Sequence, residues 1–275
     1  MEKIGIIGCG FVGSAIAAGF SLKADVRIFD KQYPVYGTLK AVCEQDILFL
    51  CLPTPQRSEI GRPDMTFIHE AIQSIKKEIK DTNKIIVIKS TILPGTCRSL
   101  TGMYPQFDFI ANPEFLTARS AKLDFINSSR VVIGGENQIA CCRLGALYSQ
   151  INGHSPIFFC SWEAAELVKY AANCFLAMKI SYFNEIYDVC QELKCNYNEV
   201  KEMVLADGRI GNSHHEVPGH DGDRGFGGSC FPKDIEAFTW WADMKGLLLD
   251  TLEAAKKVNK RIRRNIDWQL SREGE

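Results

Sequence analysis

The chain has 275 residues, of which 46% are hydrophobic and 24% are charged, and its formal net charge is −1. This is an ordinary globular composition, and so small a net charge gives no general attraction to nucleic acid or to an anionic membrane surface. No apolar run reaches the roughly 18 residues that a membrane-spanning helix needs. We therefore expect neither nucleic acid nor a membrane as a partner.

The cysteines indicate a reducing compartment. There are eleven, an odd number, scattered along a chain that begins with a short apolar strand and no signal peptide. Such usage favours free thiols over a disulfide framework, so we expect a cytoplasmic protein.

The N-terminal stretch carries a dinucleotide-binding pattern. An apolar run at residues 3–7 leads into the glycine motif of residues 8–13, a helical pattern follows to about Leu22, and a strand at 26–29 ends at Asp30. Strand, G-x-G-x-x-G, helix, strand and acid in this order form the context that the motif requires; a glycine turn in another α/β protein is the alternative. The helix N-terminus would offer N–H groups to a pyrophosphate. Asp30 would accept from ribose hydroxyls and repel a 2′-phosphate, which favours NAD over NADP. The cofactor contacts expected here are Gly8, Gly10, Phe11, Val12, Gly13, Asp30 and Lys31.

Further apolar runs predict a buried parallel sheet. They are rich in β-branched residues and nearly continuous, with helical patterns between several of them, clearest at 68–79. The runs lie at 46–51, 85–88, 107–110 and 130–133. We therefore expect an α/β fold with a Rossmann-type, doubly wound parallel sheet in an NAD-binding domain of residues 1–155.

Three loops follow strands of this sheet. They span residues 52–55, 90–96 and 112–115, and each combines proline with a hydroxyl, amide or carboxylate side chain. Ligands in such sheets contact the loops at the carboxyl ends of the strands. Ordinary turn chemistry would use the same residue types, so each loop taken singly stays ambiguous.

The chain then turns helical. After a helical pattern at 138–151 and a last short strand at 156–160, residues 163–193 contain neither glycine nor proline. A helix of that length spans two parts of a molecule or forms an oligomer interface. Further helical patterns lie at 197–205, 233–244 and 251–270, with a Gly-, His- and Asp-rich loop at 211–228. We expect a helical domain of residues 156–275 with one long central helix.

The strongest chemical signal is the stretch 225–234, Gly-Phe-Gly-Gly-Ser-Cys-Phe-Pro-Lys-Asp. It places Cys230 at a predicted helix start, a position that favours a thiolate, although most free cysteines are buried and inert. Lys169 and Asn173 lie four apart on one face of the long helix, among apolar residues. A buried lysine needs a partner or a task, but a surface lysine with a buried stem is the alternative.

A metal site has little support in the sequence. His214, His215 and His220 lie in the loop before Cys230, but their spacing is not a regular zinc pattern and no cysteine pair joins them. We expect no metal.

These motifs resemble those of the UDP-glucose/GDP-mannose dehydrogenase family, in family order across nearly the whole chain. The matching segments are 8–13, 53–55, 90–91, 112–116, 130–134, 166–173, 184–185, 209–211 and 225–234. The resemblance implies an enzyme that oxidises the C6 alcohol of a nucleotide sugar with two NAD, through a cysteine thiohemiacetal and a thioester. UDP-glucose is the expected substrate and UDP-glucuronate the product, with GDP-mannose as the alternative.

The same resemblance implies roles for individual residues. Cys230 would be the nucleophile, Glu114 the base for the hydrolytic water, and Lys169 the donor to the oxyanion or a proton carrier. Asn173 and Asp234 would hold the water and lysine network, while Thr91 would lie between nicotinamide and substrate. Further cofactor contacts would come from Pro53, Thr54, Ser90, Thr91 and Lys233. Substrate contacts would come from Glu114, Phe115, Leu116, Lys169, Asn173, Phe226 and Gly227.

The sequence also departs from the family pattern. Ala118 stands where the family usually has a second carboxylate, and the stretch from Asp30 to Asp46 is shorter than usual. The family normally continues beyond a point like Glu275 into a nucleotide-sugar domain. We therefore expect a short form that lacks this domain; a longer chain, or a partner that supplies the missing surface, is the alternative. A non-catalytic NAD- or sugar-binding relic, or a partner subunit, is the alternative from another class. By analogy with the family, the long helix predicts a homodimer.

Overall fold

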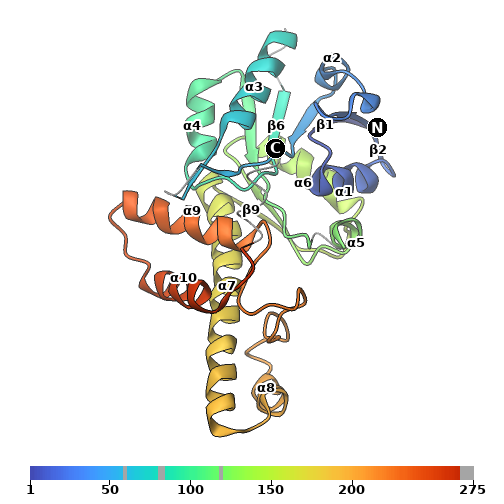
Figure 1. Cartoon of the computed structure of the whole chain (residues 1–275). Coiled ribbons are helices and arrows are strands. Elements are labelled where there is room, and N and C mark those ends of the chain that lie inside the picture. Colours follow the sequence, from blue (N-terminus) through green and yellow to red (C-terminus); the bar gives the residue numbers. More distant parts are fainter. Residues whose placement is uncertain (58–60, 80–83, 118–119, 267–275) are drawn as a thin grey trace. The chain divides into compact units, whose positions relative to one another are not determined.

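The computed structural model describes residues 1–57, 61–79, 84–117 and 120–266 (Figure 1). The chain divides into two compact units, Met1–Pro55 with Pro63–Lys169, and Gln56–Arg62 with Tyr170–Glu275. The division falls within one long helix, α7 (Trp162–Leu193). The domain boundary predicted after residue 155 precedes the last strand of the sheet and this helix.

The first unit is built on a sheet whose described strands have the order β2-β1-β3-β6-β7-β8-β9. The strands are β1 (Glu2–Ile7), β2 (Ala24–Phe29), β3 (Ile47–Leu50), β6 (Lys84–Ile88), β7 (Phe107–Ala111), β8 (Val131–Gly134) and β9 (Ile157–Cys160). Each lies where an apolar run predicted it. Two short strands, β4 (Gln56–Arg57) and β5 (Arg62–Pro63), form a separate pair.

One strand direction differs from the prediction. The strands from β2 to β7 in the sheet order pair in parallel, but β8 pairs with β7 in the antiparallel direction, through Ala111 and Gly134. β9 then pairs in parallel with β8. The predicted doubly wound α/β sheet is confirmed, but its last two strands run antiparallel to the other five. A continuous apolar run reports burial on both faces and not strand direction.

Alternating side chains of the strands enter two apolar layers. On one face, Phe49 and the strand side chains that point the same way pack with α1 (Phe11–Phe20), α5 (Ala121–Ile126) and α6 (Gln138–Ser149). On the other, Leu48 and Leu50 pack with α2 (Leu39–Cys43), α3 (Thr66–Glu78), α4 (Thr96–Met103) and the start of α7. The sequence had not revealed α2, α4, α5 or the short 3₁₀ turn η1 (Pro34–Tyr36), because such short helices show too few turns for a period to emerge.

The second unit is helical, as expected. The later part of α7 packs with α9 (Phe231–Met244) and α10 (Asp250–Ile262) through an apolar cluster that includes Cys174, Phe226 and Ala255. A second cluster joins α7 to α8 (Tyr197–Leu205) through Phe183, Cys190 and Tyr197.

The last helix is shorter than predicted. The sequence indicated 251–270, but α10 ends at Ile262 and Arg263 has extended backbone angles. The chain leaves the helix there because the backbone N–H groups of Arg264 and Asn265 bind the side chain of Asp223 instead of continuing the helical ladder. Residues 267–270 of the prediction lie outside the described residues, as does Ala118.

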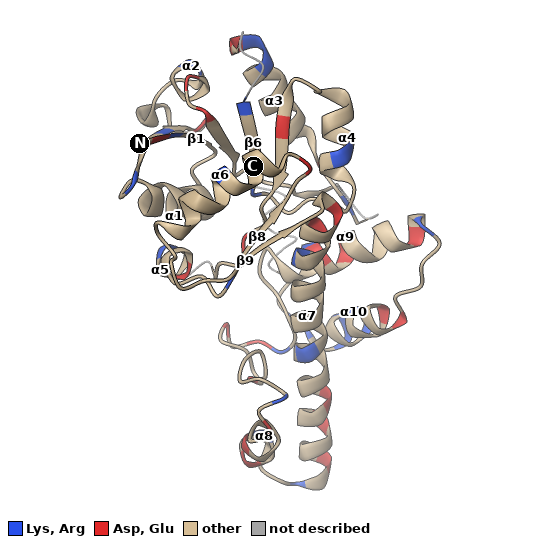
Figure 2. Cartoon of the chain, turned by 180° about the vertical axis from the view of Figure 1, so that it is seen from behind, with Lys and Arg blue, Asp and Glu red and all other residues tan. Residues whose placement is uncertain are grey.

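Charged residues of both signs are scattered along the ribbon of the described chain (Figure 2). This agrees with a net charge of −1. Among the described helices, none is both long enough and apolar enough to cross a membrane.

Candidate active site

The glycine motif closes a tight turn between β1 and α1. Gly8 has a φ of +91°, and a Cβ at Gly13 would collide with the carbonyl oxygen of Gly8. The carboxylate of Asp30 accepts hydrogen bonds from the backbone N–H of Cys9 at 2.6 Å and of Gln32 at 2.8 Å. Asp30 therefore fixes the glycine turn to the end of β2.

The same turn has the features of a pyrophosphate site. Gly10 is the residue before α1, no described side chain caps this helix, and no described atom lies within 4 Å of where a Cβ of Gly10 would be. Backbone N–H groups at a helix N-terminus beside open space suit a phosphate. Of the other predicted contacts, Phe11 and Lys31 are exposed and Val12 is half-buried. The residues present therefore fit a dinucleotide.

Two of the predicted loops are tied to each other. Ser90 accepts a hydrogen bond from the backbone N–H of Leu52 at 3.0 Å and donates one to the carbonyl of Leu52 at 2.7 Å. The hydroxyl of Thr54 donates to the carbonyl oxygen of Thr91 at 2.9 Å. Ser90 and Thr54 thus hold the two loops together, which leaves Pro53 exposed and Thr91 half-buried.

Glu166, a buried residue of α7, holds the other end of the 90–96 loop. Its two carboxylate oxygens accept hydrogen bonds from the backbone N–H groups of Gly95 at 2.6 Å and Cys97 at 2.7 Å. Burial raises the pKa of Glu166 to about 6, although these hydrogen bonds act in the opposite direction. The sequence named Glu166 only within a matching segment; a carboxylate one turn before Lys169 on a buried helix was the available signal.

Glu114 and Lys169 form a buried ion pair. The ammonium nitrogen of Lys169 lies 3.0 Å from Oε1 of Glu114, and the two residues are 5% and 8% exposed. The other carboxylate oxygen of Glu114 accepts from the backbone N–H of Leu116 at 2.6 Å. The lysine is therefore not the surface residue that the alternative described.

Two cations lie near the ring of Phe115. The guanidinium of Arg130 lies 3.8 Å from the centre of the Phe115 ring, and the ammonium of Lys169 lies 5.8 Å from it. These contacts fix the segment that carries Glu114, and Leu116 packs against the core.

A second buried lysine, Lys89, was missed by the sequence reasoning. Its ammonium donates to Oδ1 of Asn112 at 3.1 Å, to the carbonyl of Pro113 at 3.3 Å and to the hydroxyl of Tyr148 at 3.4 Å. Burial lowers the pKa of Lys89 to about 8. Lys89 fixes the segment just before Glu114, and a charged residue at the end of an apolar strand was the only hint.

A hollow in the first unit brings several of these groups together. It lies where the 90–96 loop, the Asn-Pro-Glu segment and the start of α7 meet. Its lining includes Ser90, Thr91, Asn112, Pro113, Glu166 and Lys169.

The second unit carries the cysteine. Cys230 is half-buried and directly precedes α9, and Pro232 occupies the first turn of that helix. Ser229 Oγ lies 3.8 Å from the Cys230 sulfur. The thiol therefore lies at the N-terminus of a helix, as the sequence predicted.

In the same unit, the side chains of Asn173 and Asp234 form a buried pair. Asn173 Nδ2 donates to Oδ2 of Asp234 at 2.6 Å, and the other oxygen of Asp234 binds Lys233. Asp234 is 1% exposed. Phe226 is buried in the core of this unit, and Gly227 is half-buried.

Several other cysteines have a raised thiol pKa. Burial raises the pKa of Cys51 and Cys174 to about 12 and that of Cys43 and Cys141 to about 11. Such thiols stay protonated near neutral pH. Among the residues that the structure describes, no group of three or more His, Cys, Asp or Glu side chains is placed to hold a metal ion.

The predicted site residues thus fall into two groups. Those of the first unit surround the glycine turn, the 90–96 loop and the Glu114–Lys169 pair. Those of the second unit lie on α7, in the loop that leads to Cys230 and in the first turn of α9. Lys169 and Asn173 are neighbours on α7, four residues apart.

Comparison with known proteins agrees with this reading. Residues 35–152 match the family model described as UDP-glucose/GDP-mannose dehydrogenase family, NAD binding domain, and residues 163–261 match the central domain of the same family. The UDP-glucose 6-dehydrogenase TuaD of Bacillus subtilis is 34% identical over 97% of this chain and 64% of its own length. The UDP-glucose 6-dehydrogenase of Rickettsia typhi is 34% identical over 94% of this chain and 67% of its own.

A solved structure shows the same arrangement of elements. The UDP-glucose dehydrogenase of Pyrobaculum islandicum superposes with a TM-score of 0.84 at 28% identity, over 95% of this chain and 68% of the other. The chain spans about two thirds of the length of these relatives.

A Rossmann-type domain with a dinucleotide turn, followed by a helical domain with a cysteine at a helix N-terminus, defines a class of NAD-binding dehydrogenase. Within that class, the chain belongs to the UDP-glucose/GDP-mannose dehydrogenase family, and its first unit carries the family's NAD-binding domain.

Proposed function

We propose that the chain is an NAD-dependent nucleotide-sugar 6-dehydrogenase that converts UDP-glucose to UDP-glucuronate. The observation that carries this proposal is the retention of two buried polar pairs, Glu114–Lys169 and Asn173–Asp234, in one chain with a cysteine that begins a helix. Buried polar groups are costly to keep without a task. Relatives named UDP-glucose 6-dehydrogenase support the choice of substrate.

The proposed reaction has two oxidations and one hydrolysis. NAD, when bound, accepts a hydride in each oxidation. In the first, the C6 alcohol loses a hydride and its hydroxyl proton and becomes an aldehyde. The sulfur of Cys230 then adds to the aldehyde carbon, and the oxygen takes up a proton, which gives a thiohemiacetal. Loss of a second hydride and of that proton leaves a thioester, and water cleaves the C–S bond to release the carboxylate and the thiol.

We assign Lys169 to stabilising the oxyanion and Glu114 to activating the hydrolytic water. Each addition to carbon C6 develops negative charge on its oxygen, and a fixed ammonium such as that of Lys169 stabilises such an oxyanion in a water-poor site. A carboxylate such as that of Glu114 can take a proton from the water that attacks the thioester. The two groups lie 3.0 Å apart and are both buried, so each is held in place by the other.

Asn173 and Asp234 are assigned a holding role beside Cys230. The carboxylate of Asp234 is occupied on both oxygens, by Asn173 and by Lys233, so it cannot move freely as the reaction proceeds. We assign Thr91, Ser90, Thr54, Pro53 and Lys233 to the cofactor, and Phe115, Leu116, Phe226 and Gly227 to the sugar nucleotide.

The experiment mixes the protein with NAD and one sugar nucleotide and counts NADH. About two NADH per UDP-glucose support the proposal, and a higher rate with GDP-mannose than with UDP-glucose selects the alternative substrate. If NAD binds but no sugar nucleotide yields NADH, the chain is the non-catalytic relic or partner subunit.

We further propose a cytoplasmic homodimer formed through α7. Three apolar residues of that helix, Phe175, Tyr182 and Val189, are each more than half exposed and lie seven residues apart, which places them along one side of the helix. Light scattering at micromolar concentration tests this, and a monomeric mass would contradict it. The free thiols of all eleven cysteines, which lie in the described chain, agree with a reducing compartment.

A further inference from the structure

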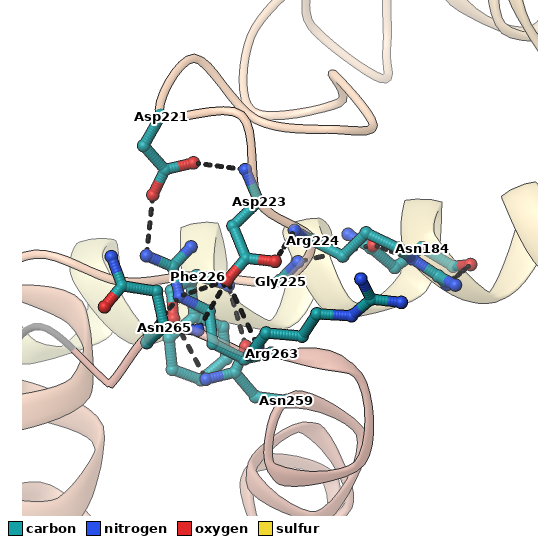
Figure 3. A network of polar contacts seen from close by, with 10 residues as sticks. Asn184, Asp221, Asp223, Arg224, Gly225, Phe226, Asn259, Arg263 and Asn265 are labelled. Carbon is teal, nitrogen blue, oxygen red and sulfur yellow. Dashed lines mark hydrogen bonds and ion pairs between the residues drawn. The ribbon is translucent and has the colours of Figure 1, made fainter.

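The loop that leads to Cys230, residues 221–230, is held by the end of the last helix. Asn259 of α10 is 4% exposed and forms a two-point contact with the backbone of Phe226 (Figure 3). Oδ1 of Asn259 accepts from the Phe226 N–H at 2.7 Å, and Nδ2 of Asn259 donates to the Phe226 carbonyl at 2.9 Å. One side chain thus satisfies both backbone polar groups of a buried residue.

Two glycines of this loop are required by the same helix. A Cβ at Gly225 would collide with Oδ1 of Asn259, and a Cβ at Gly227 would collide with the guanidinium of Arg263. Gly225 also has a φ of +74°, where other residues are strained. The glycines therefore allow the side chains of Asn259 in α10 and of Arg263 just after it to approach the loop backbone closely.

The chain just after α10 is bound to the beginning of the loop. The guanidinium of Arg263 donates to Asp221 at 2.6 Å, and Oδ2 of Asp223 accepts from the backbone N–H groups of Arg264 at 3.1 Å and Asn265 at 2.7 Å. Oδ1 of Asp223 accepts from the N–H of Arg224 at 2.8 Å. The side chain of Arg263 is almost fully buried.

The loop is also held by a second helix, α7. Oδ1 of the buried residue Asn184 accepts from the N–H of Gly225 at 3.3 Å and from Nε of Arg224 at 3.2 Å. Two asparagines on two helices thus bind two consecutive residues, Gly225 and Phe226, which lie five and four positions before Cys230 (Figure 3).

We propose that these five side chains form a clasp that sets the position of Cys230 for reaction. The clasp consists of Asn184, Asp221, Asp223, Asn259 and Arg263. They are positioning residues, since they act through the loop and the start of α9, and the inference rests on the proposed role of Cys230 as nucleophile. It follows that residues 263–265, just after α10, influence the reactivity of the cysteine.

The test compares Asn259→Ala with the matched control Lys260→Ala, an exposed neighbour on the same helix. Steady-state kinetics give kcat and KM, and mass spectrometry gives the rate at which iodoacetamide alkylates Cys230. For Asn259→Ala we expect kcat to fall about tenfold or more, which is the effect of losing one or two buried hydrogen bonds. We expect Cys230 alkylation to rise as the loop loosens, with NAD affinity unchanged.

Other cysteines separate local loosening from unfolding. Cys142 and Cys195 are exposed, and their labelling shows that the reagent is active. Cys174 is buried in the core of the unit that carries Cys230 and reacts only if that core opens. In Asn259→Ala we expect Cys174 to stay unlabelled. Wild-type kcat and wild-type Cys230 alkylation in this variant would overturn the proposal.

Two further results keep the outcomes distinct. If Asn259→Ala does not fold, Asp223→Asn and Arg263→Lys test the other end of the clasp with the same readouts, and unchanged kcat and Cys230 alkylation in both would overturn it. If the wild-type chain oxidises no sugar nucleotide, the proposed function fails. The alkylation of Cys230 relative to Cys174 still shows whether the clasp orders the loop.

Discussion

The two units hold their reactive groups in different ways. In the first, Glu114, Ser90 and the glycine turn follow directly from strands whose side chains fill two apolar layers, so the sheet itself places them. In the second, Cys230 follows a long loop that polar side chains hold from two other helices. A site on strand ends depends on the packing of a large core, whereas a site on such a loop depends on a few hydrogen bonds that single substitutions can remove.

The largest expected effect comes from replacing Cys230, which follows the loop of the second unit. Cys230→Ala should abolish acid formation, by about 10³-fold or more, because no thioester can form. NAD affinity should stay at the wild-type value, because the glycine turn belongs to the other unit. Uronic acid formation is measured by chromatography, with Cys142→Ala as the exposed control. Persistent acid formation in Cys230→Ala would mean that another group is the nucleophile.

The next largest effect concerns the Glu114–Lys169 pair of the first unit. Lys169→Met leaves the carboxylate of Glu114 buried without its cation, which should lower the free energy of unfolding by about 3–5 kcal/mol. Glu114→Gln leaves the lysine unpaired and should also destabilise. The double variant should be more stable than Lys169→Met, since it leaves no unpaired charge. Urea denaturation of the four proteins gives the coupling energy, and additive losses would show that the pair is not coupled.

A smaller effect probes the close approach between loop and helix. Gly227→Ala forces a methyl group against Arg263 and should cost about 1–3 kcal/mol of stability. The matched control is Gly102→Ala in α4, where no described atom lies within 4 Å of the new Cβ and a small gain in stability is expected. Thermal unfolding measures both, and equal behaviour of the two variants would contradict the packing that the clasp requires.

The smallest effect is the pH dependence of the clasp. Burial would raise the pKa of Asp221 and Asp223, but hydrogen bonds and the charge of Arg263 leave each pKa below the ordinary value of 3.8. The folded state therefore favours the charged carboxylates. This stability is fully present above about pH 4 and is lost as the pH falls through the lowered folded pKa.

A variant isolates this contribution. Asp221→Asn should lower the free energy of unfolding at pH 7 by about 1 kcal/mol or less, because Asp221 is partly exposed. The difference from wild type should shrink as the pH falls below about 4. Urea denaturation between pH 3 and 7 measures it, and a difference that does not depend on pH would contradict the electrostatic origin.

The sequence predicted most of the first unit because its signals are local. Every strand of the large sheet coincides with an apolar run, and the glycine motif with Asp30 has fixed spacing. The direction of β8 was not predictable in this way, because pairing depends on the path of the chain and not on composition. Lys89 and Glu166 escaped notice because their partners lie 23 and 71 residues away in the sequence.

In the second unit the sequence predicted the elements better than their contacts. Cys230 was placed at a helix start because glycine, cysteine and proline mark such a position locally. The roles of Asn259 and Arg263 depend on partners 33 and 42 residues away, and the premature end of α10 depends on Asp223. The polar helical pattern of residues 251–270 continues in the sequence beyond Ile262, although the contacts with Asp223 end the helix there.

The reversal of β8 has a consequence for how the chain tolerates change in length. Because β8 runs against β7, the Asn-Pro-Glu segment continues alongside it, where Asn112 donates to the carbonyl of Val132 at 2.6 Å and Arg130 covers Phe115. An inserted residue between Ala111 and Leu116 would shift every one of these contacts by one position. The stretch from Lys31 to Lys40, which is mostly exposed, has no such register to keep. Gains and losses of residues should therefore accumulate between Lys31 and Lys40 and be absent beside Glu114.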